Sequence, residues 1–128
     1  MAKRNSGASD LSSVLGPLEA GVMEILWHEG GAMDVRAVLE CLNADRSPAL
    51  AYTTVMTVMA RLAEKGILRR ERSGRGFVYE AAVADAAAIA VRNVMRDFGD
   101  AAMAQFVDEA RADPALRRRL EKLLRDER

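Results

Sequence analysis

The sequence predicts a mainly α-helical fold that contains one small β-hairpin. Aromatic residues make up only 5% of the 128 residues, so aliphatic side chains must fill the core, and such cores are usually helical. Apolar residues also recur three and four positions apart along most of the chain, which is the spacing of an amphipathic helix. This spacing is interrupted around the basic, glycine-rich stretch 73–76, where two short strands are expected.

The first two helices are marked by the residues at their ends. One begins at Pro17, because proline suits the first helical position, and ends at Gly30. A second covers about 34–43, with Asp34 as its N-cap, and the polar segment 43–48 follows it as a turn. The apolar faces consist of Val22, Ile25 and Leu26 in the first helix, and of Val35, Val38, Leu39 and Leu42 in the second.

A third helix is expected from about Ala51 to Lys65, and Gly66 ends it. Its core-facing residues are Val55, Val58, Met59 and Leu62. The residues on or near its other side are Tyr52, Thr53, Thr54, Met56, Thr57, Ala60 and Arg61. Two strands, at about 67–72 and 77–80, then flank the tip 73–76. Three helices followed by a basic-tipped hairpin are typical of the winged helix-turn-helix, a DNA-binding fold.

The chain after about residue 83 is expected to be helical throughout. Its three apolar stripes are Ile89, Val91, Val94, Met95 and Phe98, then Met103, Phe106, Val107 and Ala110, and then Leu116, Leu120, Leu123 and Leu124. About 45 residues with so few large apolar groups cannot build a core alone, so we expect a homodimer, since two-fold dimers are the commonest oligomers. The expected dimer contacts are Ile89, Val94, Met95, Phe98, Phe106, Leu116, Leu120, Leu123 and Leu124.

The predicted organisation has three parts. Residues 1–14 form a disordered lead, residues 15–82 form a winged-helix DNA-binding domain, and residues 83–128 form a helical dimerisation region. The formal net charge is zero, but the distribution of charge matters more than its total for a nucleic-acid binder. Residues 61–75 carry six basic and two acidic residues, a balance of +4.

Three threonines on the outer face of the third helix are the first candidates for DNA contacts. Thr53, Thr54 and Thr57 are mediocre helix formers, so helix propensity does not explain them. Their hydroxyl groups can bond phosphates or base edges and their methyl groups can contact thymine, whereas the alternative interpretation is a merely solvated face. Arg61 and Lys65 either neutralise phosphates or pair with carboxylates such as that of Glu64.

The hairpin supplies the second group of candidates. Arg75 lies between two glycines that let the backbone approach a groove, although a solvated turn arginine is the alternative. The strand arginines Arg69, Arg70 and Arg72 alternate in direction, so they cannot all face DNA. Tyr79 is expected to pack on the core rather than to stack on a base.

Catalysis and metal binding are not expected from this sequence. Its single histidine, His28, and single cysteine, Cys41, cannot supply the four ligands of a zinc site or a nucleophile with its base. We therefore expect no enzymatic activity, no metal and no cofactor. His28 is expected to cap the end of the first helix, and Cys41 to lie on the outward or flanking side of the second. A redox-sensing role for Cys41 is the alternative.

The absence of a long apolar run favours a cytoplasmic protein without a membrane anchor. No stretch approaches the roughly 20 apolar residues of a membrane span, and the polar N-terminus lacks the core of a signal peptide. The first 80 residues hold ten basic and ten acidic residues. This balance keeps a second interpretation open, namely a winged-helix module that binds proteins and never contacts DNA.

Three stretches of the sequence resemble the penicillinase repressors, a family of transcriptional regulators: LGPLEAGVMEILWHEGG, VRAVLECLN and AYTTVMTVMARLAEKGILRRERSGRGFVYEA. The resemblance extends over about residues 15–128. It implies an N-terminal winged helix, a C-terminal helical dimerisation region and repression at operators of dyad symmetry that lie between divergent genes. It also implies operator contacts from Thr53, Thr54, Thr57, Arg61 and, in the wing, Arg75. Met56 stands where some relatives carry a basic residue.

The resemblance also suggests how repression is relieved. Relatives are inactivated by proteolysis of an Asn-Phe bond in the dimerisation region, triggered by a membrane receptor that senses β-lactams. The corresponding residues here are Gln105 and Phe106, so the phenylalanine is kept and the residue before it differs. A membrane sensor protease is therefore an expected partner. The copper-responsive branch of the family ends in a cysteine cluster that this sequence lacks.

Overall fold

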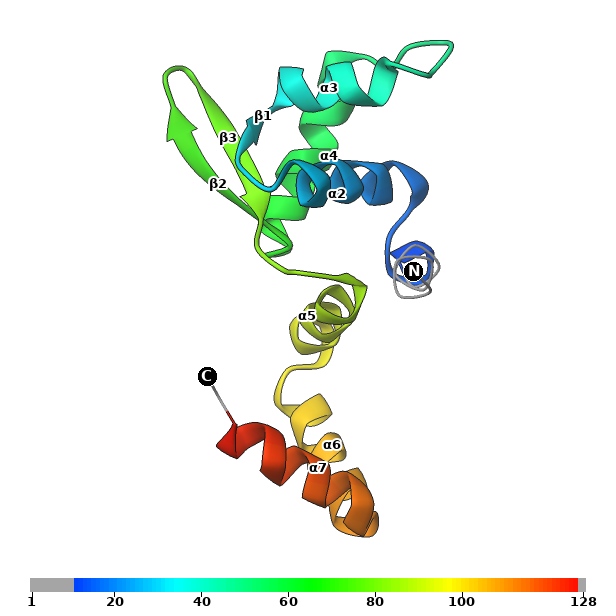
Figure 1. Ribbon diagram of the computed structural model, residues 1–128, viewed down its shortest axis with the longest axis vertical. Coiled ribbons are helices and arrows are strands. Elements are labelled where there is room, and N and C mark those ends of the chain that lie inside the picture. Colours follow the sequence, from blue (N-terminus) through cyan, green and yellow to red (C-terminus); the bar gives the residue numbers. More distant parts are fainter. Residues whose placement is uncertain (1–10, 127–128) are drawn as a thin grey trace. The chain divides into compact units, whose positions relative to one another are not determined.

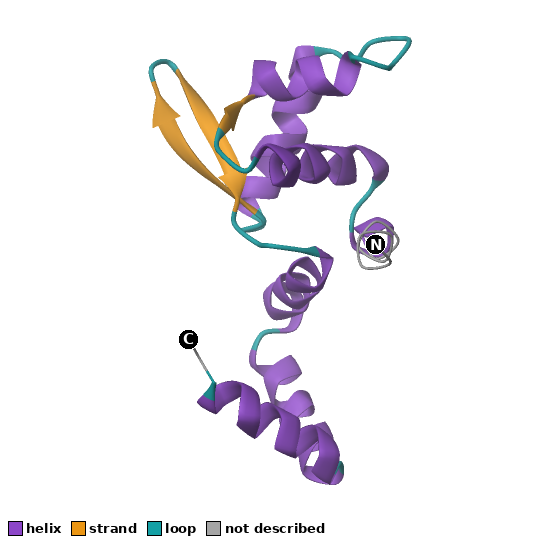
Figure 2. Ribbon diagram, viewed as in Figure 1, coloured by secondary structure: helices purple, strands orange, loops and turns teal. Residues whose placement is uncertain are grey.

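The computed structural model describes residues 11–126, which divide into two compact units at 11–93 and 94–126. Helices dominate both units, and the β-structure of the described residues is one small sheet in the first unit (Figures 1 and 2). The predicted fold class, mainly α with a winged helix-turn-helix, is therefore confirmed. Within residues 11–126, no helix has the length and apolar character that crossing a membrane requires.

Three helices surround the core of the first unit: α2 (Pro17–Glu29), α3 (Val35–Asn43) and α4 (Tyr52–Glu64). Their ends match the sequence prediction, and the side chain of Asp34 accepts a 2.8 Å hydrogen bond from the amide of Ala37 as the predicted N-cap. The fully buried side chains of these helices are Val22, Met23, Leu26, Val38, Val55, Met59 and Leu62. Burying one such side chain stabilises the fold by about 1.5–3 kcal/mol, so these contacts fix the relative positions of the three helices.

The sheet has three antiparallel strands in the order β1-β3-β2: β1 (Met33–Asp34), β2 (Leu68–Ser73) and β3 (Gly76–Ala81). The hairpin of β2 and β3 is the predicted wing, with Arg70 opposite Tyr79 and Ser73 opposite Gly76. The ring of Tyr79 is 2% exposed and belongs to the core, as predicted. The sequence did not indicate β1, because a strand of two residues is too short to show alternation.

The helix α5 (Ala86–Phe98) begins inside the first unit. Val83, Ala86 and Ile89 join the core, and Ile89 is fully buried. Arg92 donates a 2.7 Å hydrogen bond to the carbonyl of Gly66, just beyond the end of α4. The first unit therefore extends to residue 93 rather than ending at 82. The expectation that Ile89 contacts the second chain of a dimer is therefore wrong, because a side chain with no exposed surface is not available to a partner.

The N-terminal end of the first unit also differs from the expected disordered lead. Residues 11–14 are helical, and Leu11 and Leu15 are 1% and 7% exposed in the core. Their aliphatic side chains bury enough surface to order this segment, which a short isolated turn could not do alone. Residues 1–10 of the expected lead lie outside the described residues.

The second unit is built from α6 (Asp100–Ala112) and α7 (Pro114–Arg125). Asp113 caps α7 by accepting hydrogen bonds from the amides of Ala115 and Leu116, and Pro114 is the first helical residue, as predicted. Ala110, which is 9% exposed, is the one buried residue among 94–126. The large hydrophobic side chains exposed in this unit are Val94, Met95, Phe98, Met103, Phe106, Val107, Leu123 and Leu124.

We predict that Ile89→Ala lowers the free energy of unfolding by about 2–5 kcal/mol, because it leaves a cavity in the first unit. Val91→Ala is the matched control, since Val91 lies two residues away on α5 and is 61% exposed. The control should change stability by less than about 0.5 kcal/mol. Urea denaturation at one fixed protein concentration measures both variants, and equal effects would contradict the placement of Ile89 in the core.

Candidate nucleic-acid interface

The connection between α3 and α4 is held by one side chain. Asn43 ends α3, its Oδ1 accepts a 2.8 Å hydrogen bond from the amide of Leu50, and its Nδ2 donates a 3.2 Å hydrogen bond to the carbonyl of the same residue. The amide and the carbonyl of Leu50, which is half-buried, thereby both have a hydrogen-bond partner. This clamp closes the turn two residues before α4 begins, so it sets where α4 starts relative to α3.

The face of α4 opposite its buried stripe carries two neighbouring rows of residues spaced four apart. Thr53, Thr57 and Arg61 form a polar row, and all three are exposed. Tyr52, Met56 and Ala60 form an apolar row next to it, in which Tyr52 is 39% and Met56 is 41% exposed. Residues four apart lie above one another on a helix, so the predicted threonine face exists as a continuous exposed surface.

The two predicted cations of α4 have different surroundings. Arg61 is exposed, and within residues 11–126 it has no carboxylate partner. Lys65 lies 3.5 Å from a carboxylate oxygen of Glu19 on α2, and it is about 18 Å further along the helix axis than Thr53. The structure therefore brings Arg61 together with the threonines, whereas Lys65 lies at the far end of α4 with its charge already paired.

The sequence did not single out Tyr52 and Arg36, which meet at the start of α4. The guanidinium carbon of Arg36, in the first turn of α3, lies 5.1 Å from the centre of the Tyr52 ring. A cation over an aromatic ring at an exposed site stabilises the pair by about 0.5–1 kcal/mol. No sequence signal marks this contact, because the two residues belong to different helices and become neighbours only after folding.

The tip of the wing is a two-residue turn formed by Gly74 and Arg75. Gly74 has a φ of +60°, a conformation that disfavours residues with a Cβ, and Arg75 has a negative φ. This pattern fits the type II′ turn, which matches the twist of a hairpin. Arg75 is exposed at the tip without a carboxylate partner in the described chain.

The arginines of β2 divide between the two faces of the wing. Arg69 donates hydrogen bonds of 3.1 and 2.9 Å to one carboxylate oxygen of Glu80 on β3, so its charge is neutralised. Arg70 and Arg72 lie on the other face, over the ring of Phe77 at 4.3 and 5.7 Å. The structure thus confirms that these three arginines do not point the same way.

The lengths of α4 and the wing place the start of α4 and the tip of the wing near the same level. A helix of 13 residues is about 20 Å long, and a strand of six residues, such as β2, is also about 20 Å long. Because β2 begins just after α4 ends and turns back, its tip returns toward the start of α4. Figure 1 shows the wing tip and the start of α4 at the upper end of this unit.

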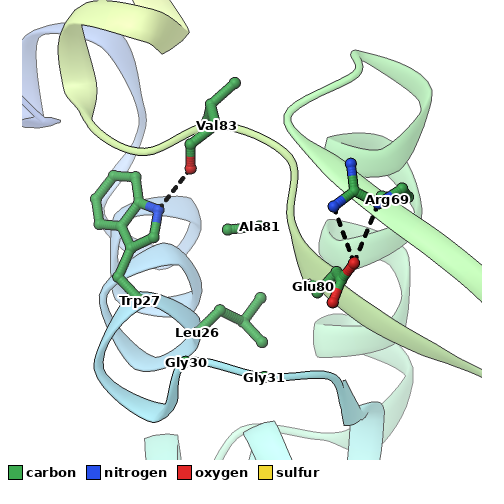
Figure 3. Close-up of a pocket in the computed structure, with 8 residues that line it drawn as sticks. All are labelled: Leu26, Trp27, Gly30, Gly31, Arg69, Glu80, Ala81 and Val83. Atoms are coloured by element: carbon green, nitrogen blue, oxygen red, sulfur yellow. Dashed lines mark hydrogen bonds and ion pairs between the residues drawn. The ribbon is translucent and has the colours of Figure 1, made fainter. Parts of the chain in front are cut away.

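Two hollows lie away from this surface. One, of about 270 Å³, is lined by the end of α2 and the base of the wing (Figure 3). Its polar groups are already partnered, because the Trp27 indole donates a 2.8 Å hydrogen bond to the Val83 carbonyl and Arg69 pairs with Glu80. The other lies between α2 and α3 and is lined in part by His28 and by Cys41, which is exposed as predicted. Among residues 11–126, no group of three or more metal-ligating side chains is arranged to hold an ion.

A helix-turn-helix with an exposed threonine-rich helix and a basic-tipped hairpin defines the winged-helix class. The family model of the penicillinase repressors matches residues 15–126. The chain belongs to the penicillinase repressor family. The protein named transcriptional regulator BlaI from Mycobacterium tuberculosis, in strains CDC 1551 / Oshkosh and H37Rv, is 40% identical over 85% of this chain and 84% of its own length. The chain is therefore a transcriptional repressor and not an enzyme.

We predict that Asn43→Ala lowers the free energy of unfolding by about 1–3 kcal/mol, because the amide and carbonyl of Leu50 both lose their partner. Ala49→Ser, at an exposed position of the same loop, should change stability by less than about 0.5 kcal/mol. Hydrogen exchange at the Leu50 amide should accelerate only in the first variant. An unchanged exchange rate there would show that Asn43 does not close the turn.

Proposed function

We propose that this protein represses transcription as a homodimer that binds an inverted-repeat operator through α4 and the wing. The observation that carries the proposal is the exposed polar row of Thr53, Thr57 and Arg61 on the second helix of a helix-turn-helix. In this class, the N-terminal part of the second helix contacts base edges in the major groove. A symmetric dimer presents two such helices to two half-sites.

The proposed DNA contacts divide into those that recognise the base sequence and those that position the protein on the DNA backbone. The threonines, including Thr54 on the neighbouring row, lie in the first two turns of α4, and we propose that they contact bases. Arg61, one turn further on, and Arg75, at the tip of the wing, are proposed to contact phosphates. The N-cap of α4 is Ala51, which offers no side-chain acceptor. The amides of Tyr52 and Thr53, the first two of α4, are therefore open to a phosphate, which helix N-termini bind well.

The dimer is proposed to form through the exposed apolar surface of the second unit. Phe106, Val107, Leu120 and Leu124 line a groove of about 480 Å³, and Leu116 and Leu120 are only half-buried. Two short helices that leave this much apolar surface in water need a partner, because so small a unit cannot cover it alone. A second copy supplies a matching surface through a two-fold axis.

We propose further that repression is released by proteolysis between Gln105 and Phe106. Both residues lie inside α6, where Gln105 bonds to Glu109 and Phe106 is 51% exposed. A protease that cuts this bond, for example one controlled by a membrane sensor of cell-wall or β-lactam signals, requires the helix to unwind locally. The cut would divide the dimerisation surface while leaving α4 intact. Operator affinity would then fall because the two DNA-binding units lose their connection.

We predict that Arg61→Ala weakens binding to duplex DNA of every sequence and lowers the slope of log affinity against log salt by about 2, because each subunit of the dimer loses one phosphate contact. Lys65→Ala is the matched control, since Lys65 is paired with Glu19 at the far end of α4. Its slope should equal that of the wild type. Binding is measured by fluorescence anisotropy on DNA from upstream of the protein's own gene, at several salt concentrations.

Each other outcome of this experiment has a definite meaning. Equal losses in the two variants would contradict the distinction drawn between Arg61 and Lys65. If the wild type binds no duplex even at low salt, DNA binding itself is wrong, and the winged helix serves as a protein-interaction module.

We predict that Leu124→Glu shifts the protein from a dimer toward the 14.0 kDa monomer, because a carboxylate would be buried at the interface without a partner. The dissociation constant of the dimer should rise on the order of tenfold or more. Arg118→Glu, which places the same carboxylate on the opposite face of α7, should leave the dimer intact. Sedimentation equilibrium distinguishes the two variants, and a wild type that is monomeric at all concentrations would refute the dimer.

A further inference from the structure

Two large hydrophobic side chains of α4, Tyr52 and Met56, lie outside the core of the first unit and are exposed. Within residues 11–93, the exposed large hydrophobic side chains are Tyr52 and Met56, at 39% and 41%, and Val91 on α5. Tyr52 and Met56 lie four residues apart, so they adjoin each other on one side of the helix. Single exposed apolar residues are ordinary, but here the pair is confined to the helix that carries the threonines.

The pair forms a defined edge of the proposed DNA-binding surface. Tyr52 is the first residue of α4, and its ring is held by the Arg36 guanidinium at 5.1 Å. Met56 lies one turn further on, beside Thr53 and Thr57 of the polar row. A ring that is held in place loses little conformational freedom on binding, and the unbranched thioether of methionine adapts to the shape of an apolar partner.

The major groove offers one apolar group to such a surface. Thymine carries a C5-methyl group there, whereas the edges of guanine, cytosine and adenine present donors and acceptors. Neither the thioether of Met56 nor the face of the Tyr52 ring forms a strong hydrogen bond with these polar edges. The apolar row therefore favours thymine methyl groups over every other feature of the groove.

We propose that Met56, supported by Tyr52, selects operators by packing against thymine C5-methyl groups in each half-site. The inference rests on the proposed function, because it requires α4 to enter the major groove. It assigns a specificity-determining role to the apolar row, whereas the neighbouring polar row supplies hydroxyl and guanidinium contacts. Operator preference then depends on where thymines occur, beyond the hydrogen-bonding pattern of the bases.

The test removes the methyl group and changes nothing else on the base edge. A binding site is first selected from a pool of random duplexes with the wild-type protein, and each thymine is then replaced singly by deoxyuridine. Removing a contacted methyl group should weaken wild-type binding about fourfold, by analogy with the burial of one methylene group. Replacements at thymines outside the contact should leave binding unchanged.

Two variants test whether Met56 is the side chain that contacts the thymine methyl group. Met56→Ala should bind the thymine site more weakly and should no longer distinguish thymine from deoxyuridine at the same position. Met56→Leu keeps an apolar side chain of similar volume and should retain the distinction. Both substitutions exchange good helix formers at an exposed position, so neither should unfold α4.

The outcomes separate this inference from the proposed function. Wild-type binding that is sequence-specific but indifferent to deoxyuridine would overturn the inference and leave the repressor function intact. A Met56→Ala variant that keeps the full methyl effect would overturn the role of Met56. Absence of binding to any member of the duplex pool would overturn the proposed function as well, and the apolar row would then be a surface for a protein partner.

Discussion

The buried stripe of α4 is the constraint on which the rest of the first unit depends. Val55, Met59 and Leu62 are fully buried and repeat at helical spacing, so they fix the rotation of α4 about its own axis. Once that rotation is fixed, the rows of Thr53 and Tyr52 must face away from the core. A change that rotated the buried stripe would move every proposed DNA contact of α4 together, although it touched none of them.

A second set of contacts joins α4 to the helix that follows the wing. Ile89 packs in the same core, and Arg92 of α5 bonds to the Gly66 carbonyl just beyond the end of α4. A guanidinium at the C-terminal end of a helix also complements the helix dipole. The first turns of α5 are therefore part of the DNA-binding unit and not of a separate linker. Unfolding of these turns would remove contacts that hold α4 in place.

The sequence predicted most of this fold because its signals are local. Pro17, Asp34 and Asp113 mark helix ends through contacts with their own neighbours, and the two glycines around Arg75 mark the tip of the wing. For Ile89 the sequence predicts a dimer contact and the structure shows a core residue. Helical spacing shows which residues share a face, but it does not show what that face packs against. The Arg36–Tyr52 and Asn43–Leu50 contacts depend on the packing or turn geometry of the folded chain, so no short pattern shows them.

The charges of the first unit support the proposal that two copies bind DNA together. Glu19 neutralises Lys65 and Glu80 neutralises Arg69, so the basic segment 61–75 keeps fewer free cations than its sequence suggests. Few phosphate contacts per unit mean weak sequence-independent binding, because that binding scales with the number of phosphates neutralised. We therefore expect a single unit to bind its site weakly, and two linked units, as in the proposed dimer, to bind together with higher affinity. In the proposed dimer, separating the two units would therefore empty the operator without altering any residue that is proposed to contact DNA.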